Sequence, residues 1–189
     1  MNRILAAKAI PARLLRIVPA LVTALVIPLA APPAPAQQDR LAEQVRHELA
    51  MLPYISVFDY LGFRVEGSRV TLTGYTVRPT NRSTAENVVK RIEGIEEVDN
   101  QIEVLPPSGS DRRIRAGVRA KLQRMLPRYF AGPTASIRII VKNGNVTLFG
   151  VVDSERDKQI AGIQTNSVSG VFGVENELTV QPPAKNNKT

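Results

Sequence analysis

Two stretches of this chain carry the same pattern of residues. Residues 64–107 align with residues 140–183 without a gap at an offset of 76, and 12 of the 44 aligned pairs are identical. Upstream of this block, two sets of apolar positions match at an offset of 73: Leu41, Val45, Leu49 and Leu52 against Ile114, Val118, Leu122 and Met125. The second copy therefore has three extra residues, and the chain is expected to fold as two copies of one module.

The first half of each copy reads as a helix followed by a β-hairpin. Apolar residues at i, i+4, i+8 and i+11 predict a helix with one buried face, which ends at Leu52-Pro53 or Leu126-Pro127 because proline disfavours helical geometry in the preceding residue. Strands are predicted over 60–66 and 136–142, each followed by a tight turn. The second turn is Asn143-Gly144, a pair typical of type I′ hairpins.

The second half of each copy reads as strand, helix, strand. Gly74 and Gly150 fall on the apolar face of the predicted second strand, where a missing side chain suits a closely crossing helix or a bulge. Pro79 and Asp153-Ser154 are typical helix-start residues, and Gly94 and Gly170 are expected to end these helices. The last strands are predicted over 98–104 and 174–180.

The predicted fold class is therefore α+β, with two tandem α-β-β-α-β modules. Each module is expected to be a small mixed three-stranded sheet packed with two helices, because the hairpin is antiparallel and the strand-helix-strand crossover is parallel. The expected boundaries are 37–107 and 108–183, joined by a short linker at 105–110 that does not fix their angle. The polar tail 184–189 is expected to be disordered.

Residues 1–36 have the features of a secretory signal. Arg3, Lys8, Arg13 and Arg16 precede an apolar run of 15 residues and the small-residue sequence Ala34-Pro35-Ala36. This run is shorter than the roughly 20 residues of a spanning helix, so we expect cleavage near Gln37, with an uncleaved anchor as the alternative. Export places the protein in the periplasm or outside the cell, where peripheral contact with a membrane is feasible.

The inventory of reactive residues argues against enzymatic chemistry. The chain has no cysteine and one histidine, so thiolate zinc sites, cysteine nucleophiles, disulfides and lipidation are excluded. His47 lies opposite the apolar stripe of its helix and is expected on the surface. Glu96, Glu97 and Asp99 are interpreted as a solvated edge. Asp153, Glu155 and Asp157 are interpreted as helix-start residues that cap the helix and complement its dipole, with a cation or acid–base role as the alternative. We expect no catalytic residues, metal or cofactor.

One polar residue recurs on the apolar face of the last strand. Asn100 and Asn176 occupy the same position of the two copies, between apolar residues on either side. A buried amide must form hydrogen bonds, and nearby backbone groups are the expected partners.

Charge separates the two copies. Residues 37–107 contain 8 basic and 11 acidic residues, whereas residues 108–184 contain 11 and 6. Seven basic residues and no acidic one lie between 112 and 128, followed by two aromatic residues. We therefore expect a lipid-binding face made of Arg112, Arg115, Arg119, Arg128, Tyr129 and Phe130. The alternative is that the arginines form a solvated face and that Tyr129 and Phe130 cap the core.

The repeated motif resembles the BON domain, a small module of bacterial envelope proteins. Val70-Thr71-Leu72-Thr73-Gly74 with 94–104, and Val146-Thr147-Leu148-Phe149-Gly150 with 170–180, both match its pattern. The resemblance implies an exported protein like the osmotically induced periplasmic proteins and dual-BON outer-membrane proteins, whose proposed role is attachment to phospholipid surfaces. This chain lacks the lipidated cysteine of the lipoprotein members.

Two classes of function follow from these observations. In the first, the protein is non-enzymatic and binds anionic phospholipid at a membrane surface. In the second, it is an adaptor that binds envelope proteins or glycans through its sheet edges and the cleft between its modules. Nucleic acid is not an expected partner, because an exported protein rarely meets it.

Overall fold

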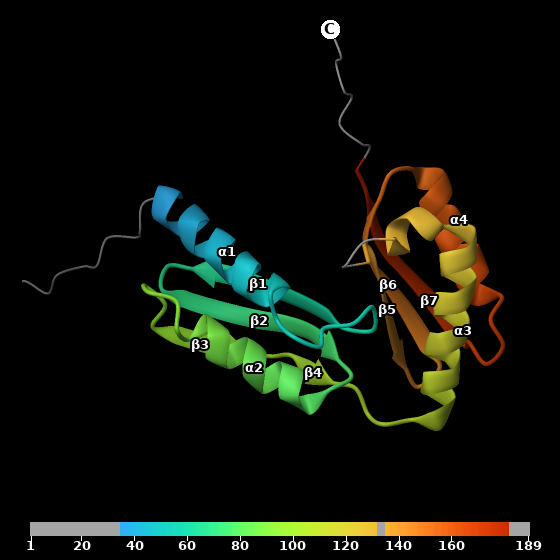
Figure 1. The fold of residues 1–189 in the computed structure, drawn as a ribbon, viewed down its shortest axis with the longest axis horizontal. Helices are drawn as coiled ribbons and strands as arrows, with labels where there is room; N and C mark the ends of the chain where they lie inside the picture. The colour runs from blue at the N-terminus through green and yellow to red at the C-terminus, as the bar shows by residue number, and fades with distance from the viewer. Residues whose placement is uncertain (1–34, 132–134, 182–189) are drawn as a thin grey trace, which may run out of the picture. The chain divides into compact units, whose positions relative to one another are not determined.

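The computed structural model describes residues 35–131 and 135–181, which contain two α-β modules in succession (Figure 1). The predicted leader up to residue 34 and the predicted tail 184–189 lie outside the described residues. The first module contains α1 (Pro35–Ala50), β1 (Tyr60–Glu66), β2 (Arg69–Thr76), α2 (Pro79–Val89), β3 (Glu97–Asn100) and β4 (Glu103–Val104). The second contains α3 (Gly109–Met125), the 3-10 turn η1 (Pro127–Phe130), β5 (Ile137–Lys142), β6 (Asn145–Val152), α4 (Glu155–Asn166) and β7 (Gly173–Val180).

Both sheets are mixed, as predicted. β1 pairs with β2 antiparallel and β2 pairs with β3 and β4 parallel, and β5, β6 and β7 repeat this arrangement. Val65, Val70 and Val98 are register partners in the first sheet. Their counterparts at the offset of 76 are register partners in the second. The last strand is interrupted between β3 and β4 in the first module and continuous in the second.

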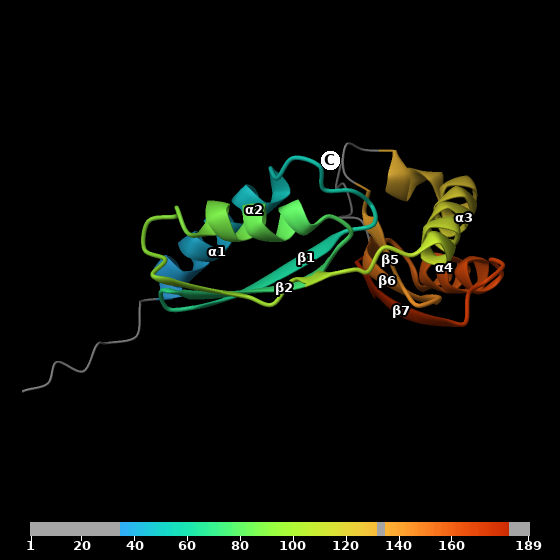
Figure 2. The same ribbon diagram turned by 90° about the horizontal axis from the view of Figure 1, so that it is seen from below.

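Each module buries the apolar face of its helices against one face of its sheet, and Figure 2 shows α1 and α2 on the same side of β1 and β2. The apolar stripe of the first module is buried as expected, from Leu41 in α1 to Leu52 just beyond the end of the helix. In α3 the stripe ends differently, because Met125 is 48% exposed and Leu126 takes its place in the core. The backbone leaves helical geometry at Leu126 (φ −132°, ψ 54°), which turns this side chain inward.

The paired glycines of the second strand have a different role from the one expected. A Cβ on Gly74 would lie 2.1 Å from the carbonyl oxygen of Tyr60, and one on Gly150 would lie 1.9 Å from that of Ser136. Both glycines have a strongly positive φ, 113° and 127°. The close approach is therefore that of the backbone of the neighbouring strand, where a crossing helix or a bulge was expected.

The glycines expected to end the second helices lie beyond the helix ends. α2 ends at Val89 and α4 at Asn166, whereas Gly94 and Gly170 take positive φ values of 92° and 88° in the turns that lead to the last strands. Their conformational freedom serves the entry into β3 and β7. The Asn143-Gly144 turn has positive φ at both residues, 52° and 80°, as a type I′ turn requires.

A segment of the first module packs against the second. Val57 and Phe58, which precede β1, join the partly buried residues around the second core. The Ile139 N–H donates to the Val57 carbonyl at 2.8 Å, and the Arg138 guanidinium donates to the Ser56 carbonyl at 3.0 Å. These contacts join the modules in addition to the linker.

Candidate functional site

The basic helix α3 is held at its start by the hairpin of its own module. The Ser108 side chain accepts a hydrogen bond from the Asp111 N–H at 3.2 Å, which caps the helix. The buried Asp111 carboxylate accepts from the N–H groups of Asn143 and Gly144 at 3.0 and 2.9 Å. The β5–β6 turn therefore lies against the first turn of α3.

Arg115 points into the protein. Only 8% of this residue is exposed, and its guanidinium donates to the Val141 carbonyl at 2.8 Å. Burial lowers the pKa of Arg115, while the carboxylates of Asp111 and Asp59 act in the opposite direction. Its position in the sequence places it among surface arginines, but its role in the structure is to support β5.

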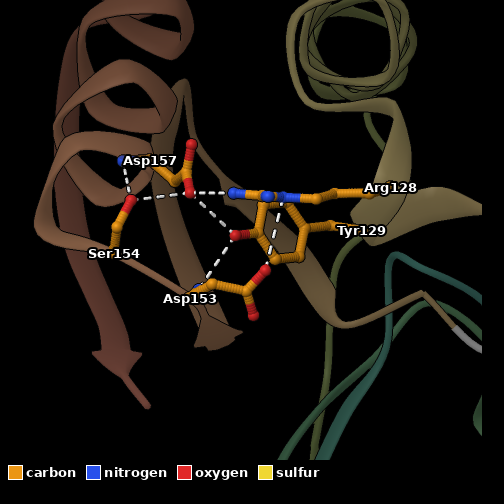
Figure 3. A network of polar contacts seen from close by, with 5 residues as sticks. All are labelled: Arg128, Tyr129, Asp153, Ser154 and Asp157. Atoms are coloured by element: carbon orange, nitrogen blue, oxygen red, sulfur yellow. Dashed lines mark hydrogen bonds and ion pairs between the residues drawn. The ribbon is translucent and has the colours of Figure 1, made fainter. Parts of the chain in front are cut away.

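Arg128 and Tyr129 belong to a polar network with the start of α4 (Figure 3). Arg128 forms ion pairs with Asp153 and Asp157 and lies over the Tyr129 ring, 4.9 Å from its centroid. The Tyr129 hydroxyl donates to Asp157 at 2.9 Å and accepts from the Asp153 N–H at 2.8 Å. Ser154, the N-cap of α4, also donates to Asp157, at 2.7 Å.

The network changes the acidity of its members. The hydrogen bond from Ser154 is the main cause that lowers the pKa of Asp157, and hydrogen bonds from Tyr129 and Arg128 add to it. Burial raises the pKa of Tyr129. The segment 153–157 therefore caps the start of α4 as expected, with Ser154 as the N-cap. In addition, Asp157 joins η1 to α4.

The expected lipid-binding face is not one surface. Tyr129 is 5% exposed and belongs to the second core, and Phe130 is half-buried against that core. Arg115 is buried and Arg128 is ion-paired, so only Arg112 and Arg119 of the six predicted residues are exposed without such pairing within residues 35–131 and 135–181. The expectation of a common exposed face was wrong, and the alternative that the two aromatic residues cap the core describes the structure.

Four arginines remain on the outer surface of α3: Arg112, Arg113, Arg119 and Arg124. Among the described residues, none of them forms an ion pair. Arg112 and Arg119 are two helical turns apart on one flank, and Arg113 and Arg124 are three turns apart on the other. The exposed residues between the flanks include Ala116 and Ala120, so small side chains leave all four guanidinium groups accessible.

The other candidate residues have structural roles. His47 is exposed on α1, as expected. Glu96, Glu97 and Asp99 are exposed at the sheet edge, where Glu97 pairs with Arg69 at 2.6 Å. The part of the chain that the structure describes contains no group of three potential metal ligands. No helix in that part is long and apolar enough to cross a bilayer.

The two asparagines bond as expected. The Asn100 amide donates to the Arg82 carbonyl at 3.0 Å, and the Asn176 amide donates to the Lys158 carbonyl at 2.7 Å. Arg82 and Lys158 are themselves equivalent positions of the repeat. Each amide therefore joins the last strand to the second helix of its module.

Comparison with protein families decides what this repeat is. The family model described as the BON domain matches residues 37–106 and again residues 110–182. The chain belongs to the BON-domain family. Membership in this family indicates a non-catalytic protein associated with the cell envelope.

Other comparisons add little to the BON assignment. Two solved structures of CdsD, a structural protein of the type III secretion system of Chlamydia trachomatis, are 10% identical to this chain. The match to the first covers 77% of this chain and 94% of the CdsD chain, with a TM-score of 0.31. The match to the second, a structure of the C-terminal domain, covers 75% of this chain and 98% of the CdsD chain, with a TM-score of 0.28. Similarity at this level supports no functional conclusion. No curated protein matches the chain.

The second BON module has an exposed aromatic residue that the sequence analysis missed. Phe172, in the turn between α4 and β7, is 82% exposed. It lines a groove of about 500 Å³ together with Arg113, Ser108, Asn143 and Gly144. The repeat contained a signal for it, because the aligned position in the first module is Glu96. At this position of the turn, one copy has a large apolar side chain and the other has an acid. An exposed apolar side chain of this size is unusual for a surface that contacts only solvent.

Proposed function

We propose that this protein binds anionic phospholipid surfaces of the cell envelope through the exposed arginines of α3 in its second BON module. The observation that carries the proposal is that Arg112, Arg113, Arg119 and Arg124 lie on one helix surface with no acidic partner in the described residues. Export through the predicted leader brings such a surface to the periplasmic or outer side of a membrane. The proposed role is binding, without catalysis.

The strength of this attraction suits reversible contact. A basic residue near an anionic membrane contributes about 1 kcal/mol, so four of them contribute about 4 kcal/mol, which corresponds to a dissociation constant of about 1 mM for electrostatics alone. Because these side chains are exposed, salt screens them over a Debye length of about 10 Å at 0.1 M. Binding should therefore weaken strongly as ionic strength rises.

The corresponding helix of the first module has mixed charge. On α1, Arg46 pairs with Glu43, and its guanidinium lies 5.8 Å from the centroid of the Phe63 ring. Arg40 shares this helix with Glu43 and Glu48, so basic and acidic side chains alternate along it. The proposal therefore assigns membrane contact to the second module.

The test is sedimentation of the purified exported protein with vesicles of neutral lipid and of neutral lipid mixed with anionic lipid. The variant Arg112→Glu/Arg119→Glu removes two attractions and adds two repulsions of similar size, a change of about 4 kcal/mol. It is expected to abolish binding to anionic vesicles. Charge reversal at Arg115 or Arg128 would not be a clean test, since these residues support the fold.

The matched control is Arg40→Glu/Arg91→Glu, which changes the net charge by the same amount at two exposed positions of the first module. This variant is expected to bind like the original protein. Equal loss in both variants would show that only net charge matters and would overturn the assignment to α3. If the original protein ignores anionic vesicles at low salt, lipid binding is wrong and the adaptor function for envelope proteins or glycans takes its place.

A further inference from the structure

We infer that Phe172 is the apolar anchor of this surface, and that the α4–β7 turn inserts its aromatic ring into the bilayer beside the N-terminal end of α3. The inference rests on the proposed function and specifies which part of the second module touches the acyl chains. Among the large apolar side chains of residues 35–131 and 135–181, Phe172 is the most exposed, at 82%. It is distinct from the aromatic pair 129–130 that the sequence analysis favoured.

The backbone around Phe172 is held in place. Its N–H donates to the Gly144 carbonyl at 2.9 Å, and its neighbour Val171 packs against the second core and donates to the Val168 carbonyl at 3.2 Å. The aromatic ring rests on the hairpin turn, because a Cβ on Gly144 would lie only 2.4 Å from the ring. One side of the ring therefore contacts the protein while the other faces solvent without further rearrangement.

Basic charge lies next to the ring. Arg113 lines the same groove, and the helix flank that carries it also faces the turn: Gly117 lies close to Val168, and Lys121 donates to the Ser167 hydroxyl at 2.6 Å. The acid nearest to Arg113 in the sequence, Asp111, is buried and already accepts two backbone hydrogen bonds. An exposed aromatic ring beside an exposed arginine is the combination that interfacial membrane binding uses.

The first module shows what this turn looks like without such a function. Its aligned residue, Glu96, is exposed and accepts a hydrogen bond from the Ser68 hydroxyl at 3.0 Å, across the hairpin turn that corresponds to Asn143-Gly144. The carboxylate would be repelled by anionic headgroups and would not enter the acyl region. The two turns share a backbone position but differ in chemistry.

The test uses a tryptophan as a probe of depth. The chain contains no tryptophan, so Phe172→Trp introduces a single one at the proposed anchor. With vesicles of mixed neutral and anionic lipid, its emission is expected to shift to shorter wavelength and to be quenched by lipids with brominated acyl chains. Glu96→Trp is the control, and its emission is expected to stay unchanged and unquenched.

A second variant measures how much the ring contributes. Burial of a phenylalanine side chain provides enough free energy that Phe172→Ala should lower the partition coefficient about tenfold. Because Phe172 is exposed in the protein, this change should leave the circular dichroism spectrum and the unfolding midpoint unaltered. Phe172→Leu, which keeps an apolar side chain, should lose much less binding.

The outcomes separate the two proposals. If the original protein binds anionic vesicles but the emission of Phe172→Trp is neither shifted nor quenched, or Phe172→Ala binds equally well, the anchor is wrong and the arginine surface stands. If the original protein does not bind at all, the proposed function falls together with the anchor. Quenching in Phe172→Trp without quenching in Glu96→Trp, together with weaker binding of Phe172→Ala, supports both.

Discussion

The two modules satisfy the same backbone group with different side chains. After the second strand, the Val77 N–H of the first module donates to the Asp59 carboxylate at 2.8 Å, while the equivalent Asp153 N–H of the second donates to the Tyr129 hydroxyl at 2.8 Å. Asp59 also accepts from the Thr76 hydroxyl at 2.7 Å. A position that must have a hydrogen-bond partner thus has a carboxylate in one copy and a phenol in the other.

The difference shows where a duplicated fold is free to diverge. Both acceptors come from the segment between the first helix and the first strand, which is the segment where the second copy has three extra residues. The N–H that needs this acceptor lies between the second strand and the second helix of the module, so these two elements set the requirement. Asn100 and Asn176 illustrate the opposite case, because the amide, its backbone partner and its position are the same in both copies.

The largest expected effect comes from removing Tyr129. Tyr129→Ala deletes a buried aromatic ring and leaves the Asp153 N–H without its acceptor, so the free energy of unfolding should fall by about 3–5 kcal/mol. Urea unfolding measures the loss, and hydrogen exchange shows which module is affected. Protection should drop in β5, β6 and β7 first.

A milder change sharpens the comparison at this junction. Tyr129→Phe keeps the ring and removes only the hydroxyl, so it should cost about 1–3 kcal/mol for the unsatisfied N–H. Asp59→Ala should instead lower protection in the first module. It leaves the Val77 N–H without its acceptor and leaves the Thr76 hydroxyl with only the Arg78 carbonyl, at 3.2 Å. If either variant were as stable as the original protein, the proposed equivalence of Asp59 and Tyr129 would be incorrect.

An effect of similar size, and equal in the two modules, is expected at the paired glycines. Gly74→Ala and Gly150→Ala each force a side chain into positive φ and against a neighbouring carbonyl, a strain of about 1–3 kcal/mol. Because the geometry repeats in both modules, the two losses measured by urea unfolding should agree within about 0.5 kcal/mol. A large loss in one module alone would break the structural equivalence of the second strands.

The elements that repeat in the two copies were predictable from the sequence, whereas the direction in which individual side chains point was not. The apolar stripes, the Asn143-Gly144 turn and the asparagines follow from local spacing, so the α+β order and the mixed sheets were correctly expected. The direction of an arginine side chain on a helix was not accessible in the same way. Arg115 lies at the edge of the apolar stripe, and only the position of β5, with the Val141 carbonyl as acceptor, turns it inward.

The aromatic residues show the same limit. Tyr129 and Phe130 stand beside Gly132-Pro133 in the sequence, a context that suggested an exposed loop. In the structure, η1 turns Tyr129 into the core toward Asp157. Phe172 was overlooked because it lies between glycines in a turn without periodicity. Comparison of the two copies position by position, Phe172 against Glu96, would have identified it without any structure.

The smallest expected effect is on the stability of the protein at acidic pH. Asp157 occupies the position of Asn81 in the first module, and its pKa is held below the ordinary value, mainly by the Ser154 hydrogen bond. Since the folded pKa is lower than the unfolded one of about 3.9, its contribution is fully present above that pH and is lost as pH falls through the folded pKa. Asp157→Asn, which makes the second module resemble the first here, should therefore flatten the acid limb of the stability curve below about pH 4. Urea unfolding between neutral and acidic pH measures this, and an unchanged acid limb in the variant would show that Arg128, Tyr129 and Ser154 do not stabilise the charged form of Asp157.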